Sequence, residues 1–194
     1  NINEGLKTAA QVDYVARCGS FRKSGLAYTG ALKILQVILS YDYLWLNIRV
    51  KGGAYGCMSG FGRSGEGYLV SYRDPNLKET NEIYEGIPEY LRQFNPDDRD
   101  MTKYVIGTIS NMDTPLTPSV KGSRGLSAYL SGVTEEMMQK ERDEVLTATK
   151  EDIRALADIV QAVLDTGSFC VVGNEEKIEA NREMFGSVES LSRA

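Results

Sequence analysis

The chain has 194 residues and a net charge of −5, so it is long enough for one domain with a substantial core. The acidic balance provides no basic surface for nucleic acid, and no apolar run approaches the roughly 20 residues that span a bilayer. Histidine is absent, which excludes a Ser-His-Asp or Cys-His site and a His-ligated catalytic zinc within this chain.

The first half of the chain predicts a strand, a long helix and a hairpin. Alternating apolar side chains predict a strand over residues 7–18, followed by a polar, glycine-bearing loop. Apolar residues at helical spacing then predict a helix from about Thr29 to Val50, with a bend near residues 40–42. Turn residues at 63–66 predict a hairpin. Its strands are expected at residues 54–62 and 67–73.

The second half is mainly helical. Thr80 is predicted to cap a helix that Pro88 bends, and Thr149 with Asp152 resembles a capping box. The charged segment 134–147 is expected to be mostly exposed to solvent. Helices are expected near residues 80–91, 101–112, 123–130, 134–147, 149–163 and 174–185, and Asn174 is expected to cap the last of them. The other segments are expected to be a loop at residues 113–119, a short buried strand at residues 168–172 and a loose tail at residues 186–194.

This order of elements favours the α+β class. A hairpin followed by helices that do not alternate with strands predicts a mostly antiparallel sheet with helices on one face. Residues 1–194 are interpreted as a single domain. Cys18, Cys57 and Cys170 lie in apolar or strand-like contexts and form no C-x-x-C pair. Buried, reduced thiols are therefore expected, and a zinc ribbon is excluded.

The segment Tyr41–Gly56 concentrates the residues best suited to binding. It holds the only tryptophan and places Arg49, Gly52, Gly53 and Tyr55 within seven residues. A guanidinium offers a fork of donors to carbonyls or carboxylates, a phenol offers one neutral donor, and glycines let a ligand approach the backbone. In the alternative interpretation, the glycines only cap the helix, the arginine is paired on the surface and the tyrosine packs in the core.

Four stretches carry a resemblance to a known family: residues 3–15, 40–56, 70–76 and 114–122, with NEGL, QVDYV, SYDYLW, VSYRDPN, TPLTP and KG among their motifs. They resemble the last of the four homologous domains of the pitrilysin/insulinase superfamily of zinc metallopeptidases, in the bacterial form of the presequence-protease-like branch. The resemblance implies an α/β sandwich, with a mostly antiparallel sheet covered by helices, inside a clamshell that encloses a chamber. It also implies zinc on an H-x-x-E-H helix of another domain, a motif that this chain lacks.

The same resemblance implies roles for individual residues. Arg49 and Tyr55 match the family's auxiliary catalytic pair, which binds substrate and stabilises the tetrahedral intermediate when the clamshell closes. Gly52 and Gly53 are the expected substrate-binding glycines, and Trp45 with Ile48 is expected to anchor this corner in the core; no residue of this chain is expected to bind metal.

Expectations for the wider protein follow from the resemblance. The chain starts at Asn1 without methionine, so it is interpreted as a fragment of a longer enzyme, inactive by itself. Peptide substrates and the other domains of the same polypeptide are the expected partners, with zinc as the cofactor of the full-length enzyme and the bacterial cytoplasm as its compartment. Neither nucleic acid nor a membrane is expected as a partner. A fragment that exposes a domain interface is expected to self-associate.

Other interpretations compete with this one. The superfamily includes subunits that have lost catalysis, so a binding or assembly domain is the alternative function. A phosphate-binding loop at residues 51–53 is disfavoured because no G-x-x-x-x-G-K-[ST] motif is present. The carboxylate pairs at residues 97–98 and 135–136 lie in solvent-exposed patterns, which disfavours acid–base chemistry or calcium binding there.

Overall fold

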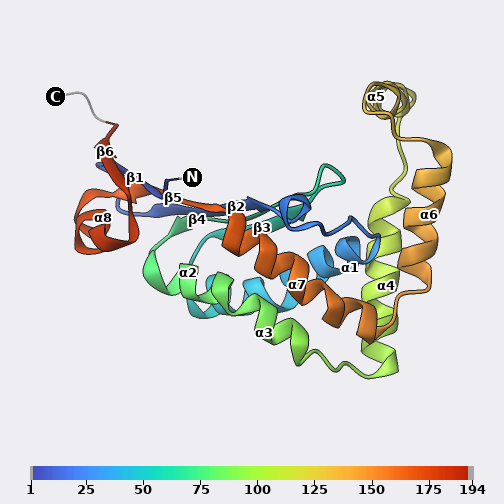
Figure 1. The fold of residues 1–194 in the computed structure, drawn as a ribbon, viewed down its shortest axis with the longest axis horizontal. Coiled ribbons are helices and arrows are strands. Elements are labelled where there is room, and N and C mark those ends of the chain that lie inside the picture. The colour runs from blue at the N-terminus through green and yellow to red at the C-terminus, as the bar shows by residue number, and fades with distance from the viewer. Residues whose placement is uncertain (1, 192–194) are drawn as a thin grey trace.

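The computed structural model describes residues 2–191, and within them a six-stranded sheet has the order β3-β4-β2-β5-β1-β6 (Figure 1). The strands are β1 (Glu4–Thr8), β2 (Asp13–Ser20), β3 (Gly56–Phe61), β4 (Glu66–Asp74), β5 (Ser168–Asn174) and β6 (Ser187–Ser190). The helices are α1 (Ala31–Ile38), α2 (Lys78–Glu85), α3 (Ile87–Arg92), α4 (Asp98–Met112), α5 (Pro118–Leu130), α6 (Glu135–Leu146), α7 (Lys150–Thr166) and α8 (Glu175–Ala180).

The pairing of the strands confirms the α+β class with a mostly antiparallel sheet. β4 pairs antiparallel with β3 and β2, and β2 pairs antiparallel with β5. The parallel pairs in the described part of the sheet are β1 with β5 and β1 with β6. The hairpin between β3 and β4 turns where the sequence predicts, with Gly65 at φ 90° in the left-handed region that favours glycine.

Helices α1, α2, α3 and α7 lie against one face of the sheet (Figure 1). The predicted apolar stripe of α7 is buried there, from Ile153 to Val163, and Thr149 with Asp152 forms the predicted capping box. Tyr14, Met58 and Tyr68, which lie on sheet strands, are 46%, 45% and 43% exposed. The face opposite these helices is therefore largely open to solvent in the described part of the chain.

Three predictions about the N-terminal strand and the tail are wrong. Residues 7–18 are not one strand, because β1 ends at Thr8, whose hydroxyl accepts a hydrogen bond from the Ala10 N–H (3.2 Å) in the turn before β2. Residues 187–190 form β6 rather than part of a loose tail, while residues 192–194 of that tail lie outside the described residues. Cys18 is exposed instead of buried; all three cysteines are free thiols.

The helix around Thr80 also differs from the prediction. α2 begins at Lys78, and Thr80 is buried with its hydroxyl donating to the Asp74 carboxylate (2.8 Å) instead of capping the helix. Pro88 lies in the first turn of α3, where its missing N–H costs no intrahelical bond. The predicted cap does occur at Asn174 for α8, and Asp97 caps α4.

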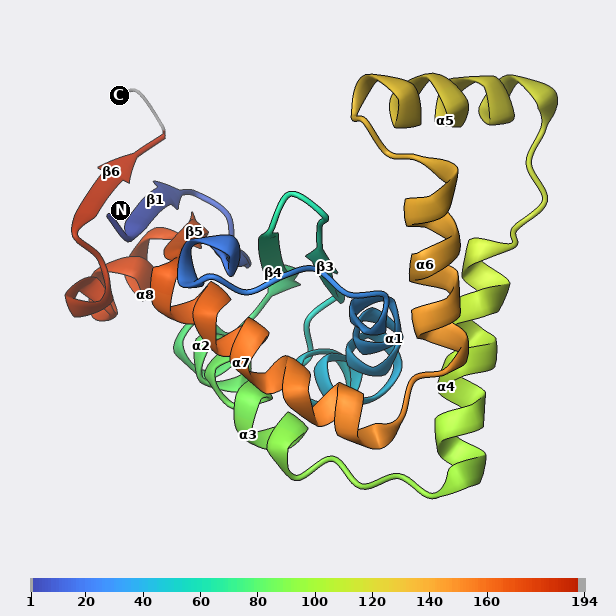
Figure 2. The ribbon, with the colours of Figure 1, turned by 45° about the vertical axis from the view of Figure 1, so that its right-hand side comes forward.

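Helices α4 and α6 run side by side and carry α5 away from the rest of the chain (Figure 2). No residue of α5 is buried, and its apolar side chains Leu126, Tyr129 and Leu130 are 60%, 82% and 74% exposed. The charged segment of α6 is not entirely solvated, since Glu141 is buried and Glu144 accepts the Gly30 N–H at the start of α1 (2.6 Å). Within residues 2–191 we find no helix with the length and apolar character that a bilayer crossing requires.

Candidate functional site

The candidate site lies where the long helix that starts with α1 comes to its end. Beyond Ile38 the helix continues as two π-helical segments, Leu39–Tyr43 and Trp45–Lys51, in place of the predicted bend. One face of these segments is buried through Leu39, Leu44 and Ile48. Such wider turns are uncommon and occur frequently at functional sites, because they rotate side chains out of the regular helical positions.

The glycine pair ends the helix. The Gly53 N–H donates to the Arg49 carbonyl (3.0 Å), and the Ala54 N–H donates to the Ile48 carbonyl (3.1 Å). Gly53 has φ 80°, a conformation that a residue with a β-carbon adopts only with strain. The helix-capping interpretation of the glycines is therefore confirmed, and it is compatible with a further role in binding.

Arg49 is half-buried near the helix end and lies close to two aromatic rings. Its guanidinium carbon is 4.5 Å from the centroid of Trp45 and 5.6 Å from that of Tyr55. Nη1 donates a hydrogen bond to the Tyr55 carbonyl. Among the ion pairs of the described residues, none includes Arg49, so the expectation of a surface-paired arginine is wrong.

The structure separates the two residues that were expected to anchor this corner. Ile48 is 1% exposed and belongs to the core, as predicted. Trp45 is 42% exposed and packs against the guanidinium of Arg49 instead, so its assignment to the core is wrong. Indole is the ring that attracts cations most strongly, and the contact helps to fix the direction of the arginine.

Tyr55 lies at the surface, and the core-packed alternative for it is therefore wrong. Its side chain is 58% exposed, its ring centroid is 5.6 Å from that of Tyr72, and the guanidinium carbon of Arg73 is 5.6 Å from its ring centroid. The guanidinium groups of two arginines thus lie close to the tyrosine ring. Sequence reasoning missed Arg73 as a neighbour of Tyr55 because it lies on β4, far from the helix end in the sequence.

The backbone around Tyr55 is held by the end of β4. The Tyr55 N–H donates to the carbonyl of Arg73 (3.2 Å). Arg73 has φ 48°, which makes it the non-glycine residue with positive φ among those described. Gly56 leaves room for the ring of Tyr72, since a β-carbon there would lie 2.5 Å from the hydroxyl oxygen. Close packing of the two strands therefore depends on Gly56.

Two further observations describe the chemical environment of this site. Burial raises the pKa of the nearby Cys57 thiol to about 11, so it is protonated at neutral pH and is a poor nucleophile. Among the described residues there is no group of three or more Cys, Asp and Glu side chains placed to hold a metal ion. The donor set of the site is thus a guanidinium pair and a phenol.

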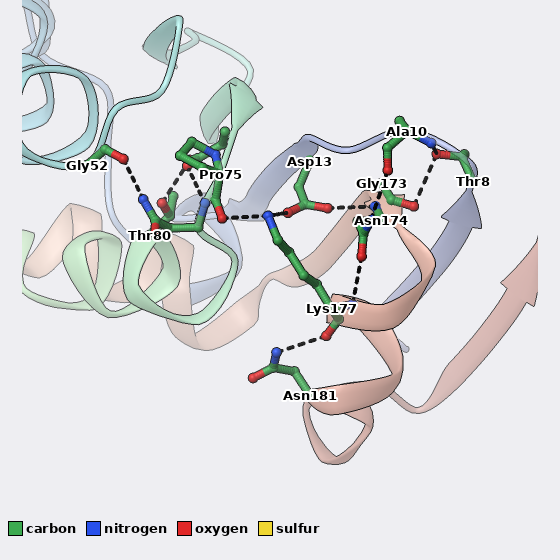
Figure 3. A network of polar contacts seen from close by, with 12 residues as sticks. Thr8, Ala10, Asp13, Gly52, Pro75, Thr80, Gly173, Asn174, Lys177 and Asn181 are labelled. Carbon is green, nitrogen blue, oxygen red and sulfur yellow. Dashed lines mark hydrogen bonds and ion pairs between the residues drawn. The ribbon is translucent and has the colours of Figure 1, made fainter.

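A network of polar contacts links the helix end to the loop after β4 and to helix α8 (Figure 3). The Asn76 amide donates to the Gly52 carbonyl (2.6 Å), and the Lys177 ammonium donates to the Pro75 carbonyl (2.6 Å). The same ammonium lies 3.4 Å from the buried carboxylate of Asp13. The sequence signals a turn at residues 74–76 but gives no sign of these partners.

The fold is shared with known peptidase domains. A protease from Helicobacter pylori superposes with a TM-score of 0.68 at 14% identity, covering 88% of this chain and 43% of that one. The inactive domain of a peptidase M16 from Pseudomonas fluorescens superposes with a TM-score of 0.64 at 14% identity, covering 89% and 43%. The fold is therefore that of a peptidase M16 domain, as the sequence resemblance predicts.

Sequence comparison identifies the family. Residues 3–175 match the model of the PreP C-terminal domain, so the chain belongs to this family. It is 48% identical to Protein HypA of Clostridium perfringens over 97% of the chain and 19% of that protein. It is 37% identical to Presequence protease 1, chloroplastic/mitochondrial, of Arabidopsis thaliana, over 92% of the chain and 17% of that protein. The chain thus spans less than a fifth of the length of these relatives.

Proposed function

We propose that residues 1–194 form the C-terminal domain of a zinc-dependent endopeptidase that degrades peptides in an enclosed chamber. In this proposal the chain supplies Arg49 and Tyr55 to bind substrate and to stabilise the tetrahedral intermediate. The observation that carries it is the placement of a guanidinium 5.6 Å from an exposed tyrosine ring, beside the end of a helix. The relationship to presequence proteases supports the peptide as the substrate class.

The chemistry of the two side chains suits this role. Peptide hydrolysis places negative charge on the former carbonyl oxygen, and donors that are already oriented stabilise that charge without reorganising. Arg49 offers a fixed fork of donors and Tyr55 one neutral O–H. Zinc belongs to another domain in this proposal, because the described residues offer no ligand group for it and the sequence has no histidine.

The glycines complete the proposed substrate surface. Gly53 is exposed, and without a side chain it lets a peptide backbone approach the helix end. The carbonyl of Gly52 already accepts the Asn76 amide, so its contribution to substrate binding would come through its second lone pair or through lack of bulk. Both glycines remain proposed substrate-binding residues.

Activity of the separate chain and of the full-length protein tests the proposed function. We expect the 194-residue chain to hydrolyse no peptide and to bind no zinc. The full-length protein is expected to do both and to lose hydrolysis when a chelator removes the metal. Peptide cleavage by mass spectrometry and metal content by emission spectroscopy are the measurements. Cleavage by the purified 194-residue chain would show that bond breaking does not need another domain.

An assembly role is the second candidate, and the exposure of α5 favours it. Leu126, Tyr129 and Leu130 recur at helical spacing and form an apolar stripe without cover in the described residues. A helix of this length is marginal in water without packing. We therefore propose that other domains of the same polypeptide pack on α5 in the full-length protein. This role is compatible with catalysis elsewhere in that protein.

The exposed stripe makes the purified chain prone to self-association. We expect serine at positions 126, 129 and 130 together to lower the fraction of dimers and larger species, because the change removes the apolar area that copies would share. Light scattering after size-exclusion chromatography measures this. Serine at Ile106, which is 60% exposed on α4, is the control. Equal self-association of all three proteins would place the contact elsewhere.

The compartment also remains a proposal. The names of several relatives place them in mitochondria or chloroplasts. We propose the bacterial cytoplasm for the full-length protein that contains this chain, and fractionation of its native host with an antibody against the chain tests this assignment.

A further inference from the structure

We propose that Asn76 is a positioning residue that holds the turn of residues 52–55, and with it Tyr55, in place. The catalytic consequence of this inference rests on the proposed function, whereas its geometric part does not. The residues concerned lie outside the Arg49–Tyr55 pair and are drawn together by a loop, a strand end and helix α8 (Figure 3).

The link between Asn76 and the turn is a single short hydrogen bond. The side-chain amide donates to the Gly52 carbonyl at 2.6 Å. Gly52 is the residue at which the π-helical segment ends, three positions before Tyr55. A carbonyl at a helix end has no intrahelical partner. The amide therefore satisfies this group and fixes the position of the backbone that leads to Tyr55.

Asn76 is itself held by a buried carboxylate. Its backbone N–H donates to Oδ1 of Asp74 (2.9 Å), and the hydroxyl of Thr80 donates to Oδ2 (2.8 Å). Asp74 is 0% exposed, so this carboxylate depends on protein donors rather than water. Rotation of the loop would break these two hydrogen bonds to Asp74. The loop that carries Asn76 is therefore held in one position.

Helix α8 also contacts the loop that carries Asn76. The ammonium of Lys177 donates to the Pro75 carbonyl at 2.6 Å and lies 3.4 Å from Oδ2 of Asp13, which is 0% exposed. The same carboxylate accepts the Asn174 N–H at 2.8 Å. Lys177, which lies 102 positions further along the chain than Pro75, therefore fixes the backbone of Pro75. Pro75 directly precedes Asn76, whose amide contacts Gly52.

The strained residue before the loop supports a positioning role. Arg73, at φ 48°, accepts the Tyr55 N–H with its carbonyl. Positive φ is unfavourable for residues with a β-carbon and persists where the surrounding contacts determine the backbone. The contacts of Asp74, Pro75 and Asn76 follow immediately in the chain. Tyr55 is thus held through Arg73 on one side and through Gly52 on the other.

The test uses the full-length protein with Asn76→Ala and Asn76→Asp. The aspartate keeps the shape of the side chain but lacks the donor, and its carboxylate repels the Gly52 carbonyl. Asn3→Ala is the matched control, because its amide also donates to a backbone carbonyl, that of Met184 (3.3 Å), and neither residue contacts the loop or the turn. Hydrogen exchange by mass spectrometry on peptides covering residues 48–56 measures the turn; kcat, KM and Tm are measured in parallel.

We expect both Asn76 variants to exchange about tenfold faster at Gly53 and Ala54 and to lose about tenfold or more in kcat, since small misplacements of catalytic groups are costly. The control is expected to leave exchange in this peptide and kcat unchanged, even where its Tm falls as far. Unchanged exchange in the Asn76 variants overturns the inference. Faster exchange with full activity in both the Asn76 variants and Tyr55→Phe supports the geometry but rejects the proposed function, which separates the two failures.

Discussion

Replacing Tyr55 with phenylalanine in the full-length protein is expected to lower kcat by about 100- to 1000-fold, the range found when one oriented donor to an oxyanion is removed. The substitution removes only the phenolic oxygen. The ring keeps its contacts with Tyr72 and with the guanidinium of Arg73. Because the side chain is 58% exposed, the fold has little need of the hydroxyl, and the loss is expected in turnover rather than in stability.

The measurement is steady-state hydrolysis of a fluorogenic peptide, together with zinc content and Tm. Tyr68→Phe is the matched control, since Tyr68 is 43% exposed on β4 and lies away from the turn; its kcat is expected to stay unchanged. Arg49→Lys keeps the charge but loses the planar fork, and we expect it to impair turnover as well. Full turnover by Tyr55→Phe at normal zinc content would show that the phenol has no role in catalysis.

Replacing Lys177 with methionine is expected to destabilise the fold by about 2 kcal/mol at pH 7, because it leaves a buried carboxylate without its cation. Asp13 is 0% exposed, whereas the side chain of Lys177 is 34% exposed, so the loss is smaller than for a fully buried pair. The Pro75 carbonyl also loses its donor. Urea denaturation at pH 7 measures the difference in unfolding free energy.

The loss is expected to depend on pH through Asp13. Burial raises the pKa of this carboxyl above its usual value, against the opposing effects of the Asn174 N–H and Lys177. Because the pKa is raised in the folded state, the contribution of Asp13 to folding stability is fully present at pH values below its pKa in the unfolded chain, about 3.9. That contribution is lost as pH rises through the pKa of Asp13 in the folded state. Methionine raises the folded pKa of Asp13 further, so its destabilisation grows as pH rises through the folded pKa of the unsubstituted protein and is smaller below that pKa.

An exposed pair provides the control. Lys103 and Asp100 form an ion pair whose side chains are 61% and 48% exposed, and Lys103→Met is expected to change the unfolding free energy much less than Lys177→Met, because solvent screens an exposed pair. Urea curves of both variants at pH 4 and pH 7 make the comparison. An equal loss for Lys177→Met at the two pH values would show that its contact with Pro75, and not the one with Asp13, carries the stability.

Local sequence patterns predicted much of the secondary structure because helix periodicity, caps and turns depend on residues that are close together in the chain. The stripe from Ile153 to Val163 and the capping box at Thr149 require only helical spacing and a cap. The hairpin turn at residues 63–66 requires only turn chemistry. The expectation for Thr80 failed because a threonine before an apolar run is a cap by pattern, whereas the buried carboxylate of Asp74 binds its hydroxyl in the fold.

The candidate site was predicted in part. Arg49 and Tyr55 were selected from their side-chain chemistry, their spacing and the family resemblance, and the structure places them in contact at an exposed corner. Their support was not predicted, since Arg73 comes from a strand and Lys177 from a helix far along the chain. No short-range pattern in the sequence connects such distant residues with the helix end.

The sequence by itself determined the α+β class, the helix that ends at a glycine pair and the absence of imidazole chemistry. The tertiary structure alone decided that β1 and β6 pair in parallel, that Trp45 is exposed beside Arg49, and that the loop at Asn76 holds the helix end. The physical reason is that helix periodicity and capping depend on residues within a few positions, whereas strand order and buried polar partners depend on distant segments brought together by burial of the core.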